Sequence, residues 1–276
     1  MEYGNAAWGL RELPLEEQLK LTQAMGLHLL ELSIANYHRD ALQPDASAEQ
    51  IRQVKALFAQ YDVRPDCGAT GNDFTAGSAA DVRESLDRVK RAADIAAALG
   101  VKVLRIFAGF TSDSLVYGER FDRALEALQL AAEHVRGTGV RLAIETHGGV
   151  AATGDVLHHS ATVTTRIDTM RKLLESLPAA EIGMNYDPAN LAAVGGAAPE
   201  RWFGLFRDRI ALVHLKDFRD VPGGIVPAGC GEGRLDWKAL LAALKEYDGP
   251  ALIEYELPAD VEDGLRRSLR FLKQNQ

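Results

Sequence analysis

Short apolar runs alternate with amphipathic stretches along the whole chain, and this alternation indicates its secondary structure. The apolar runs predict strands at Glu2–Trp8, Leu27–Ile34, Val63–Gly68, Val101–Ala108, Val140–Thr146, Glu181–Asp187, Ile210–Asp217 and Pro250–Glu256. The amphipathic stretches predict helices at Pro14–Met25, Ala48–Tyr61, Ala79–Leu99, Glu119–Arg136, Thr164–Leu177, Pro199–Phe206, Asp236–Glu246 and Ala259–Leu272. A strand followed by a helix, repeated in this way, is typical of parallel βαβ units.

The number of these units favours an α/β architecture closed into a (β/α)8 (TIM) barrel. The chain has 276 residues, which suits one such barrel of ~250 residues. No linker, charge block or low-complexity segment interrupts the pattern, so residues 1–276 are expected to form a single domain. An open doubly wound sheet is the structural alternative, although no glycine-rich dinucleotide fingerprint follows the first strand.

Composition narrows the classes of partner that the protein can have. The net charge of −8 and the pI of about 5.4 argue against nucleic-acid binding, which needs a basic surface. The N-terminal residues lack the basic and apolar regions of a signal peptide, and no apolar run reaches the ~18–20 residues of a membrane span. Cys67 and Cys230 form no spacing motif. We therefore expect a cytoplasmic protein with neither a membrane nor a nucleic-acid partner.

Polar side chains end four successive predicted strands, where the active site of a barrel forms. These residues are Glu145, Asp187, His214 and Glu254. Taken singly, each carboxylate could cap a helix or pair with an arginine, and the histidine could be a hydrogen-bonded core residue. Together they predict one divalent metal ion, because buried acids rarely gather without a cation. Three carboxylates and one imidazole suit Mn²⁺ or Mg²⁺, with Co²⁺ or Zn²⁺ as alternatives.

The second half of the chain also carries motifs that point to a known family. They are Leu142-Ala-Ile-Glu145-Thr-His147, Asn185-Tyr-Asp187-Pro-Ala-Asn190, His214-Leu-Lys216-Asp217, Gly231-Glu232-Gly233 and Leu252-Ile-Glu254. In these motifs and in its strand and helix order, the sequence resembles the xylose isomerase-like barrels. The resemblance is to the sugar phosphate isomerase/epimerase group, which includes ketose 3-epimerases and inosose dehydratases. It implies that the four residues named above bind one divalent metal, with Mn²⁺ the first expectation.

The resemblance further implies an isomerase or epimerase of a small carbohydrate or a related polyol or keto compound. Glu145 and Glu254 would be catalytic, one removing a proton next to a metal-bound carbonyl and the other returning it through an enediolate. The main alternative is a metal-dependent lyase of the inosose dehydratase type, because the same ligands serve an elimination. An alternative of another class is a non-catalytic barrel that binds a sugar or a partner. Such a relative would be expected to have lost one of these residues.

Strand alternation adds candidates for substrate binding, because residues two apart on a strand share a face. His147 and Lys216 are expected beside the metal, where they bind or polarise substrate oxygens; His147 could instead orient Glu145. Glu31 is expected either to touch substrate or to form a buried ion pair with Arg105, and Arg105 is itself a further candidate for substrate binding.

Two further candidates lie on other strands and loops. Trp8 is interpreted either as an apolar wall for a sugar ring or as a core residue. Glu232 is interpreted either as a substrate contact or as a residue that orders its loop.

Segment 148–163 follows the fifth predicted strand and is long enough to form a lid. It contains His158 and His159, which we interpret as solvated loop residues rather than as a second metal site, because adjacent side chains diverge. The extra histidines of the related DNA-repair enzymes are missing from segments 187–190 and 227–231, which argues against a nuclease. We expect an unphosphorylated sugar, inositol-like compound or keto acid as substrate, and a homo-oligomer as in many resembling proteins.

Overall fold

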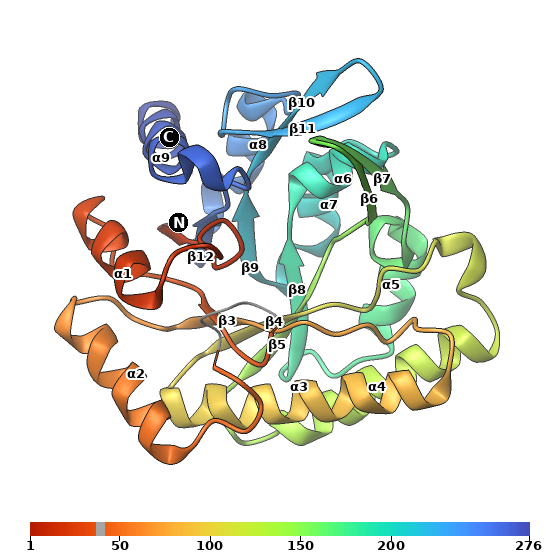
Figure 1. Cartoon of the computed structure of the whole chain (residues 1–276). Coiled ribbons are helices and arrows are strands. Elements are labelled where there is room, and N and C mark those ends of the chain that lie inside the picture. The colour runs from red at the N-terminus through yellow and green to blue at the C-terminus, as the bar shows by residue number, and fades with distance from the viewer. Residues whose placement is uncertain (37–41) are drawn as a thin grey trace.

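A computed structural model describes residues 1–36 and 42–276 of the chain (Figure 1). Parallel strands form an eight-stranded sheet in the order β1-β12-β9-β8-β5-β4-β3-β2. These strands are β1 (Glu2–Asn5), β2 (Leu32–Ser33), β3 (Cys67–Ala69), β4 (Val103–Ile106), β5 (Arg141–Glu145), β8 (Ile182–Tyr186), β9 (Ile210–Leu215) and β12 (Pro250–Ile253). A parallel bridge between Asn5 and Leu30 joins the two ends of this sheet. The α/β prediction of a (β/α)8 barrel is confirmed.

Helices follow the strands and pack around them. They are α1 (Leu15–Ala24), α2 (Ala48–Gln60), α3 (Ala79–Leu99), α4 (Glu119–Val135), α5 (Ile167–Glu175), α6 (Pro188–Val194), α7 (Pro199–Phe206), α8 (Trp237–Ala243) and α9 (Val261–Asn275). Figure 1 shows α3 and α4 running side by side along one flank of the barrel. Helix α3 begins where the Ser78 side chain accepts a hydrogen bond from the Asp81 backbone, and it ends at Gly100, whose φ of 86° favours glycine.

Some boundaries differ from the sequence prediction. The bounds of α3 and α7 match it, but the predicted strands at Leu27–Ile34 and Val63–Gly68 shorten to β2 and β3. Before these short strands the two segments meet through a single parallel bridge between Leu29 and Arg64. Helix α6, which begins at Pro188 directly after the sixth barrel strand, is missing from the prediction.

Two β-hairpins that the sequence analysis did not predict stand at the mouth of the barrel. Strands β6 (Gly149–Thr153) and β7 (Val156–Ser160) form the first, and β10 (Asp217–Val221) and β11 (Gly224–Ala228) form the second. Ile225 on β11 pairs with Leu157 on β7, so the hairpins join into an antiparallel sheet. In Figure 1 this sheet lies beyond the ends of β8 and β9. The segment expected to form a lid is thus a hairpin fixed to its neighbour.

Buried apolar side chains form separate clusters inside and outside the barrel. A small cluster includes Ala143, Leu212 and Leu252, which lie on barrel strands. A much larger cluster includes the buried faces of the helices and the alternate strand residues. No helix among the described residues is long and apolar enough to cross a membrane.

Candidate metal centre and active site

The four residues predicted to bind metal come together at the carboxyl ends of their strands. Glu145 ends β5, His214 lies on β9, and Asp187 and Glu254 directly follow β8 and β12. All four are buried, and one potential ligand atom from each lies within 4.8 Å of the others. The Nδ1 atom of His214 is 3.9 Å from Glu145 Oε1 and 3.8 Å from Glu254 Oε1.

Strand alternation places these side chains over an apolar floor. Ala143, Leu212 and Leu252 belong to the small cluster, and each precedes a site residue by two positions. Because residues two apart on a strand point the same way, Glu145, His214 and Glu254 rise from that floor toward the barrel mouth. The same alternation in the sequence predicted this shared face.

Asp187 has two roles, one for each carboxylate oxygen. Its Oδ1 atom accepts a hydrogen bond of 2.9 Å from the Asn190 backbone N–H and so caps α6. Its Oδ2 atom is buried and has no hydrogen-bond partner among the described residues, although Lys216 Nζ is 3.2 Å away. The helix therefore fixes the side chain while one oxygen stays available.

His214 is oriented by Glu31. The Nε2 atom of His214 is 3.2 Å from Glu31 Oε1, and Glu31 Oε2 accepts a hydrogen bond of 3.0 Å from the Ala7 N–H. Burial disfavours the charged imidazole, but Glu31, followed by Glu254, raises the pKa of His214 to about 9 when no metal is bound. With a metal bound, the remaining proton would lie on Nε2, and Nδ1, a buried atom with no hydrogen bond to any described residue, would be free to act as a ligand. Metal-binding histidines typically donate a hydrogen bond to a carboxylate from the ring nitrogen that does not bind the metal.

The expected ion pair between Glu31 and Arg105 is therefore wrong. Arg105 Nε instead lies 3.2 Å from Glu145 Oε2, while Glu31 reaches across the barrel interior to His214. Glu31 is fully buried and does not line the pocket, so its position does not favour the alternative of a contact with substrate. Which inward side chains meet inside a barrel depends on the tilt and stagger of its strands, which the sequence pattern does not specify.

These residues fit a divalent cation. The unpartnered Asp187 Oδ2 and His214 Nδ1 atoms, together with the carboxylates of Glu145 and Glu254, offer three oxygens and one nitrogen. Buried polar atoms without partners are costly, and a metal ion would pair both of them. The set is rich in oxygen, as Mn²⁺ and Mg²⁺ prefer, and it also suits Zn²⁺ or Co²⁺.

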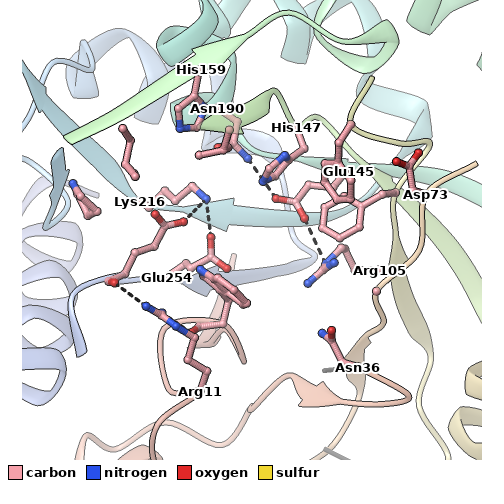
Figure 2. A pocket seen from close by; sticks show the side chains of 18 of the residues that line it. Arg11, Asn36, Asp73, Arg105, Glu145, His147, His159, Asn190, Lys216 and Glu254 are labelled. Carbon is pink, nitrogen blue, oxygen red and sulfur yellow. Dashed lines mark hydrogen bonds and ion pairs between the residues drawn. The ribbon is translucent and has the colours of Figure 1, made fainter. Parts of the chain in front are cut away.

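Lys216 supplies a buried positive charge beside this site (Figure 2). Its ammonium donates hydrogen bonds of 2.6 Å to Glu254 Oε2 and 2.7 Å to Glu256 Oε1. Burial disfavours the charged form of Glu254, but Lys216, followed by His214, lowers the pKa of Glu254 to about 2. Burial raises the pKa of Glu145, with Arg105 opposing that shift. The two carboxylates proposed for proton transfer therefore lie in different electrostatic surroundings.

A pocket of about 640 Å³ opens above the four residues. Of the six residues predicted to bind substrate, Trp8, Arg105, His147 and Lys216 line it, and Glu31 and Glu232 do not. Trp8 is 40% exposed, with the Arg11 guanidinium 4.6 Å from its ring, so it forms part of the wall and not of the core.

Glu232 forms contacts that stabilise its own loop. It is exposed, accepts a hydrogen bond of 3.2 Å from the Gly229 N–H, and pairs with Arg267 Nε at 2.7 Å. Its interpretation as a loop-ordering residue fits these contacts better than its interpretation as a substrate contact.

His147 lies in the pocket as a neutral side chain. Its Nδ1 atom is 2.6 Å from the Gly148 carbonyl, so we assign the proton there and leave Nε2 as an acceptor. Burial, followed by the Lys216 charge, lowers the pKa of His147 to about 3. Glu145 is held by Asn190 Nδ2 at 3.2 Å and by Arg105, so the structure does not support an orienting role for His147. Asn190 is a site residue that our sequence analysis missed, although its motif was noted.

His159 also belongs to the pocket, so the interpretation of this residue as a solvated loop histidine is wrong. It lines the cavity from β7, and both of its ring nitrogens are buried without a hydrogen-bond partner in the described part of the chain. Its neighbour His158 is exposed, as expected. Figure 2 shows His159 near Asn190 and His147, on the side of the pocket away from Arg11. Strand alternation would have separated the two histidines had the hairpin been recognised.

A family model described as a xylose isomerase-like TIM barrel matches residues 19–275. The chain belongs to this family. The match extends over nearly the whole barrel, including every residue of the proposed metal centre. No curated protein sequence matches the chain significantly.

Solved structures with the same fold include several enzymes. D-allulose 3-epimerase from Methylomonas sp. shares 16% identity over 100% of this chain and 98% of that chain, with a TM-score of 0.78. The probable 3-DHS dehydratase AsbF from Bacillus anthracis shares 15% identity over 100% of both chains, with a TM-score of 0.79. The IolI protein, solved with a bound zinc atom, shares 17% identity over 99% and 97%, with a TM-score of 0.77. At these identities the likeness shows the fold alone.

Proposed function

We propose that the protein is a divalent-metal-dependent isomerase or epimerase of a small carbohydrate or a related polyol or keto compound. One observation carries the proposal. Glu145 and Glu254 line the pocket beside two buried atoms that form no hydrogen bond with a described residue and could bind a metal, Asp187 Oδ2 and His214 Nδ1. This arrangement offers a cation site and two carboxylates that reach the same substrate.

Glu145, Asp187, His214 and Glu254 would hold the metal, with Mn²⁺ as the first expectation and Mg²⁺, Co²⁺ or Zn²⁺ as alternatives. The bound cation would supply positive charge next to a substrate carbonyl, which makes the adjacent C–H bond easier to ionise. The bound zinc named for the IolI structure, and the epimerase and dehydratase of the same fold, support this proposal.

The chain's own residues would move the proton and hold the substrate. Glu145 and Glu254 come from different sides of the pocket, so one would take the proton and the other would return it to the opposite face. Arg105 and Asn190 keep the Glu145 carboxylate in place, as Lys216 does for Glu254.

Two further pocket residues would orient the substrate. The Nε2 atom of His147 would accept a hydrogen bond from a substrate hydroxyl. Trp8 would form an apolar wall against the sugar ring.

A dehydratase is the second candidate, and Lys216 is the observation that favours it. An elimination of water needs a group that stabilises the departing hydroxyl, such as a positive hydrogen-bond donor, close to the base that removes the proton. The Lys216 ammonium is 2.6 Å from Glu254, and both residues line the pocket. The same carboxylate could thus start either reaction, and the fate of the hydroxyl decides between them.

Proton exchange measured by NMR tests both candidates. Protein loaded with Mn²⁺ or Mg²⁺ would be incubated in D2O with a panel of ketohexoses, inososes and hydroxy-keto acids. Deuterium that enters a substrate or its epimer supports the isomerase, whereas loss of water supports the dehydratase. Glu254→Gln should abolish the exchange, while Glu126→Gln, the same change at an exposed position of α4, should not. No exchange on any compound by the metal-loaded protein would contradict the proposal.

A further inference from the structure

The pocket above the metal centre is larger than a single sugar ring needs. It encloses about 640 Å³, within the ~300–1,000 Å³ of pockets that bury drug-sized ligands. The four ligand atoms at its base lie within 4.8 Å of one another. A single sugar ring bound over them would occupy only part of this volume, which leaves room for a substituent.

One part of the pocket wall is apolar. Phe110 and Val150 line it and are 36% and 47% exposed, and Phe107 and Leu157 continue the same wall. Apolar surface left open to water within a pocket marks a place where a ligand is bound. We call these four residues the apolar wall.

The chain holds the two parts of the apolar wall together. Phe107 and Phe110 follow β4, whereas Val150 and Leu157 lie on the β6–β7 hairpin. The Asp113 N–H, just beyond Phe110, donates a hydrogen bond of 3.0 Å to the Ala161 carbonyl, just beyond β7. The wall is therefore a built surface and not a chance exposure of separate loops.

Ring geometry favours an aromatic occupant. The centroids of Phe107 and Phe110 are 4.7 Å apart, and both rings meet His147 edge to face, at interplanar angles of 76° and 82°. A further ring placed against such a group gains edge-to-face contacts beyond simple burial. A second sugar would instead need hydrogen-bond partners along this wall, and the side chains of the four wall residues offer none.

The distribution of charge argues against a phosphate or sulfate group at the same place. Three cations line the pocket among the described residues. Arg105 and Lys216 form ion pairs with carboxylates. Arg11 stacks on Trp8 and donates a hydrogen bond to the Glu256 carbonyl at 3.3 Å. The Arg105 guanidinium also lies 4.3 Å from the centre of the Phe107 ring, but all three cations already have carboxylate or carbonyl partners among the described residues, so an uncharged substituent fits best.

We infer that the apolar wall is a subsite for an aryl substituent on the substrate. The substrate would be an aryl glycoside or a comparable polyhydroxylated ring carrying an aromatic group. The metal centre would take the polyhydroxylated ring, and Phe107, Phe110, Val150 and Leu157 would take the aryl group. This inference rests on the proposed function for the placement of the first ring, and it adds the class of substrate.

Binding of unreactive glycosides tests the subsite separately from the reaction. The metal-loaded protein would be titrated by calorimetry with phenyl β-D-glucopyranoside and with methyl β-D-glucopyranoside. We expect the phenyl compound to bind at least about tenfold more tightly, which corresponds to ~1.4 kcal/mol. Equal affinities, or no binding of either compound at millimolar concentration, would overturn the inference. Because neither compound has a carbonyl group to enolise, tight phenyl binding without exchange on ketoses would instead refute only the proposed function.

A pair of variants locates the preference on the apolar wall. Phe110→Ala should reduce the ratio of phenyl to methyl affinity toward one, and Val150→Ala provides a second, smaller truncation if the first does not fold. Leu115→Ala is the matched control, because Leu115 lies on the same segment, is 57% exposed and does not line the pocket. A ratio that stays high in Phe110→Ala and Val150→Ala would place the phenyl group elsewhere and overturn the inference.

Discussion

Glu31 Oε1 and His214 Nε2 lie 3.2 Å apart inside the barrel, although 183 positions separate the two residues in the sequence. In a metal-bound protein the carboxylate would hold the histidine proton on Nε2 and leave Nδ1 facing Glu145 and Glu254. Glu31 would therefore influence a bound metal through His214 without touching it. Such partners orient the ligand and strengthen its binding to the metal.

Replacing Glu31 tests this role. Glu31→Gln keeps the size of the side chain but removes its charge, so His214 loses the anion that holds its tautomer. We expect the affinity for Mn²⁺ to fall ~10–100-fold, measured by titration with electron paramagnetic resonance detection. Glu175→Gln, the same change at an exposed residue of α5, should leave the affinity unchanged. An unaltered affinity in Glu31→Gln would contradict the role assigned to Glu31.

Asp187→Asn should separate metal binding from folding. Asparagine still offers an oxygen to the Asn190 N–H and caps helices about as well as aspartate, so α6 should be retained. It no longer offers an anionic oxygen in place of Oδ2. We expect metal content, measured by mass spectrometry after dialysis, to fall well below one equivalent. The circular dichroism spectrum should stay like that of the wild type; a variant that keeps a full equivalent of metal would argue against Asp187 as a ligand.

The metal centre could be predicted because the barrel repeats one simple rule. Glu145, His214 and Glu254 lie at or near the carboxyl ends of parallel strands, on the face that points into the barrel. The fold brings the carboxyl ends of all its strands together at one mouth. That rule needs only the order of the strands and the period of two. It also identified Lys216, which lies two residues after His214.

The contacts between those residues could not be predicted in the same way. Glu31 pairs with His214 and Arg105 pairs with Glu145 because of the tilt and stagger of the strands. The sequence does contain a signal for the β6–β7 hairpin, because a glycine followed by an aspartate is typical of a two-residue hairpin turn. Gly154 and Asp155 form this connection, and the φ of Gly154 is 61°. Recognising it would have assigned His159 to the strand face that lines the pocket.

Lys216→Met should destabilise the metal-free protein strongly. The change leaves Asp187, Glu254 and Glu256 without the ammonium that now lies within 3.2 Å of each. Removing one partner of a buried ion pair costs ~3–5 kcal/mol, which urea denaturation would measure. Lys102→Met is the matched control, because Lys102 pairs with Asp66 at 3.0 Å but is 69% exposed, and its loss should cost ~1 kcal/mol or less.

Added metal should restore part of the stability that Lys216→Met loses. A divalent cation neutralises two of the carboxylates that the variant leaves uncompensated, Asp187 and Glu254. The increase in melting temperature on adding Mn²⁺ should therefore be larger for the variant than for the wild type. An equal increase would mean that Lys216 and the metal act on separate groups of charges.

Asp217 follows Lys216 and organises the loop that leads into α8. Its Oδ1 atom accepts hydrogen bonds from the backbone of Phe218, Arg234 and Leu235, and its Oδ2 atom from the Gly233 backbone and the Trp237 indole. Because bonds to a charged acceptor contribute ~1.5–3 kcal/mol each, Asp217→Ala should lower the free energy of unfolding by about 3 kcal/mol or more.

A second aspartate nearby gives the comparison for Asp217→Ala. Asp236 accepts one hydrogen bond of 3.0 Å, from the Ala239 N–H, and is exposed, so Asp236→Ala should cost only the ~1 kcal/mol of a lost helix cap. Urea denaturation of both variants should therefore give the larger loss for Asp217→Ala. Equal losses of unfolding free energy in the two variants would mean that the hydrogen bonds to the Asp217 carboxylate do not stabilise this loop.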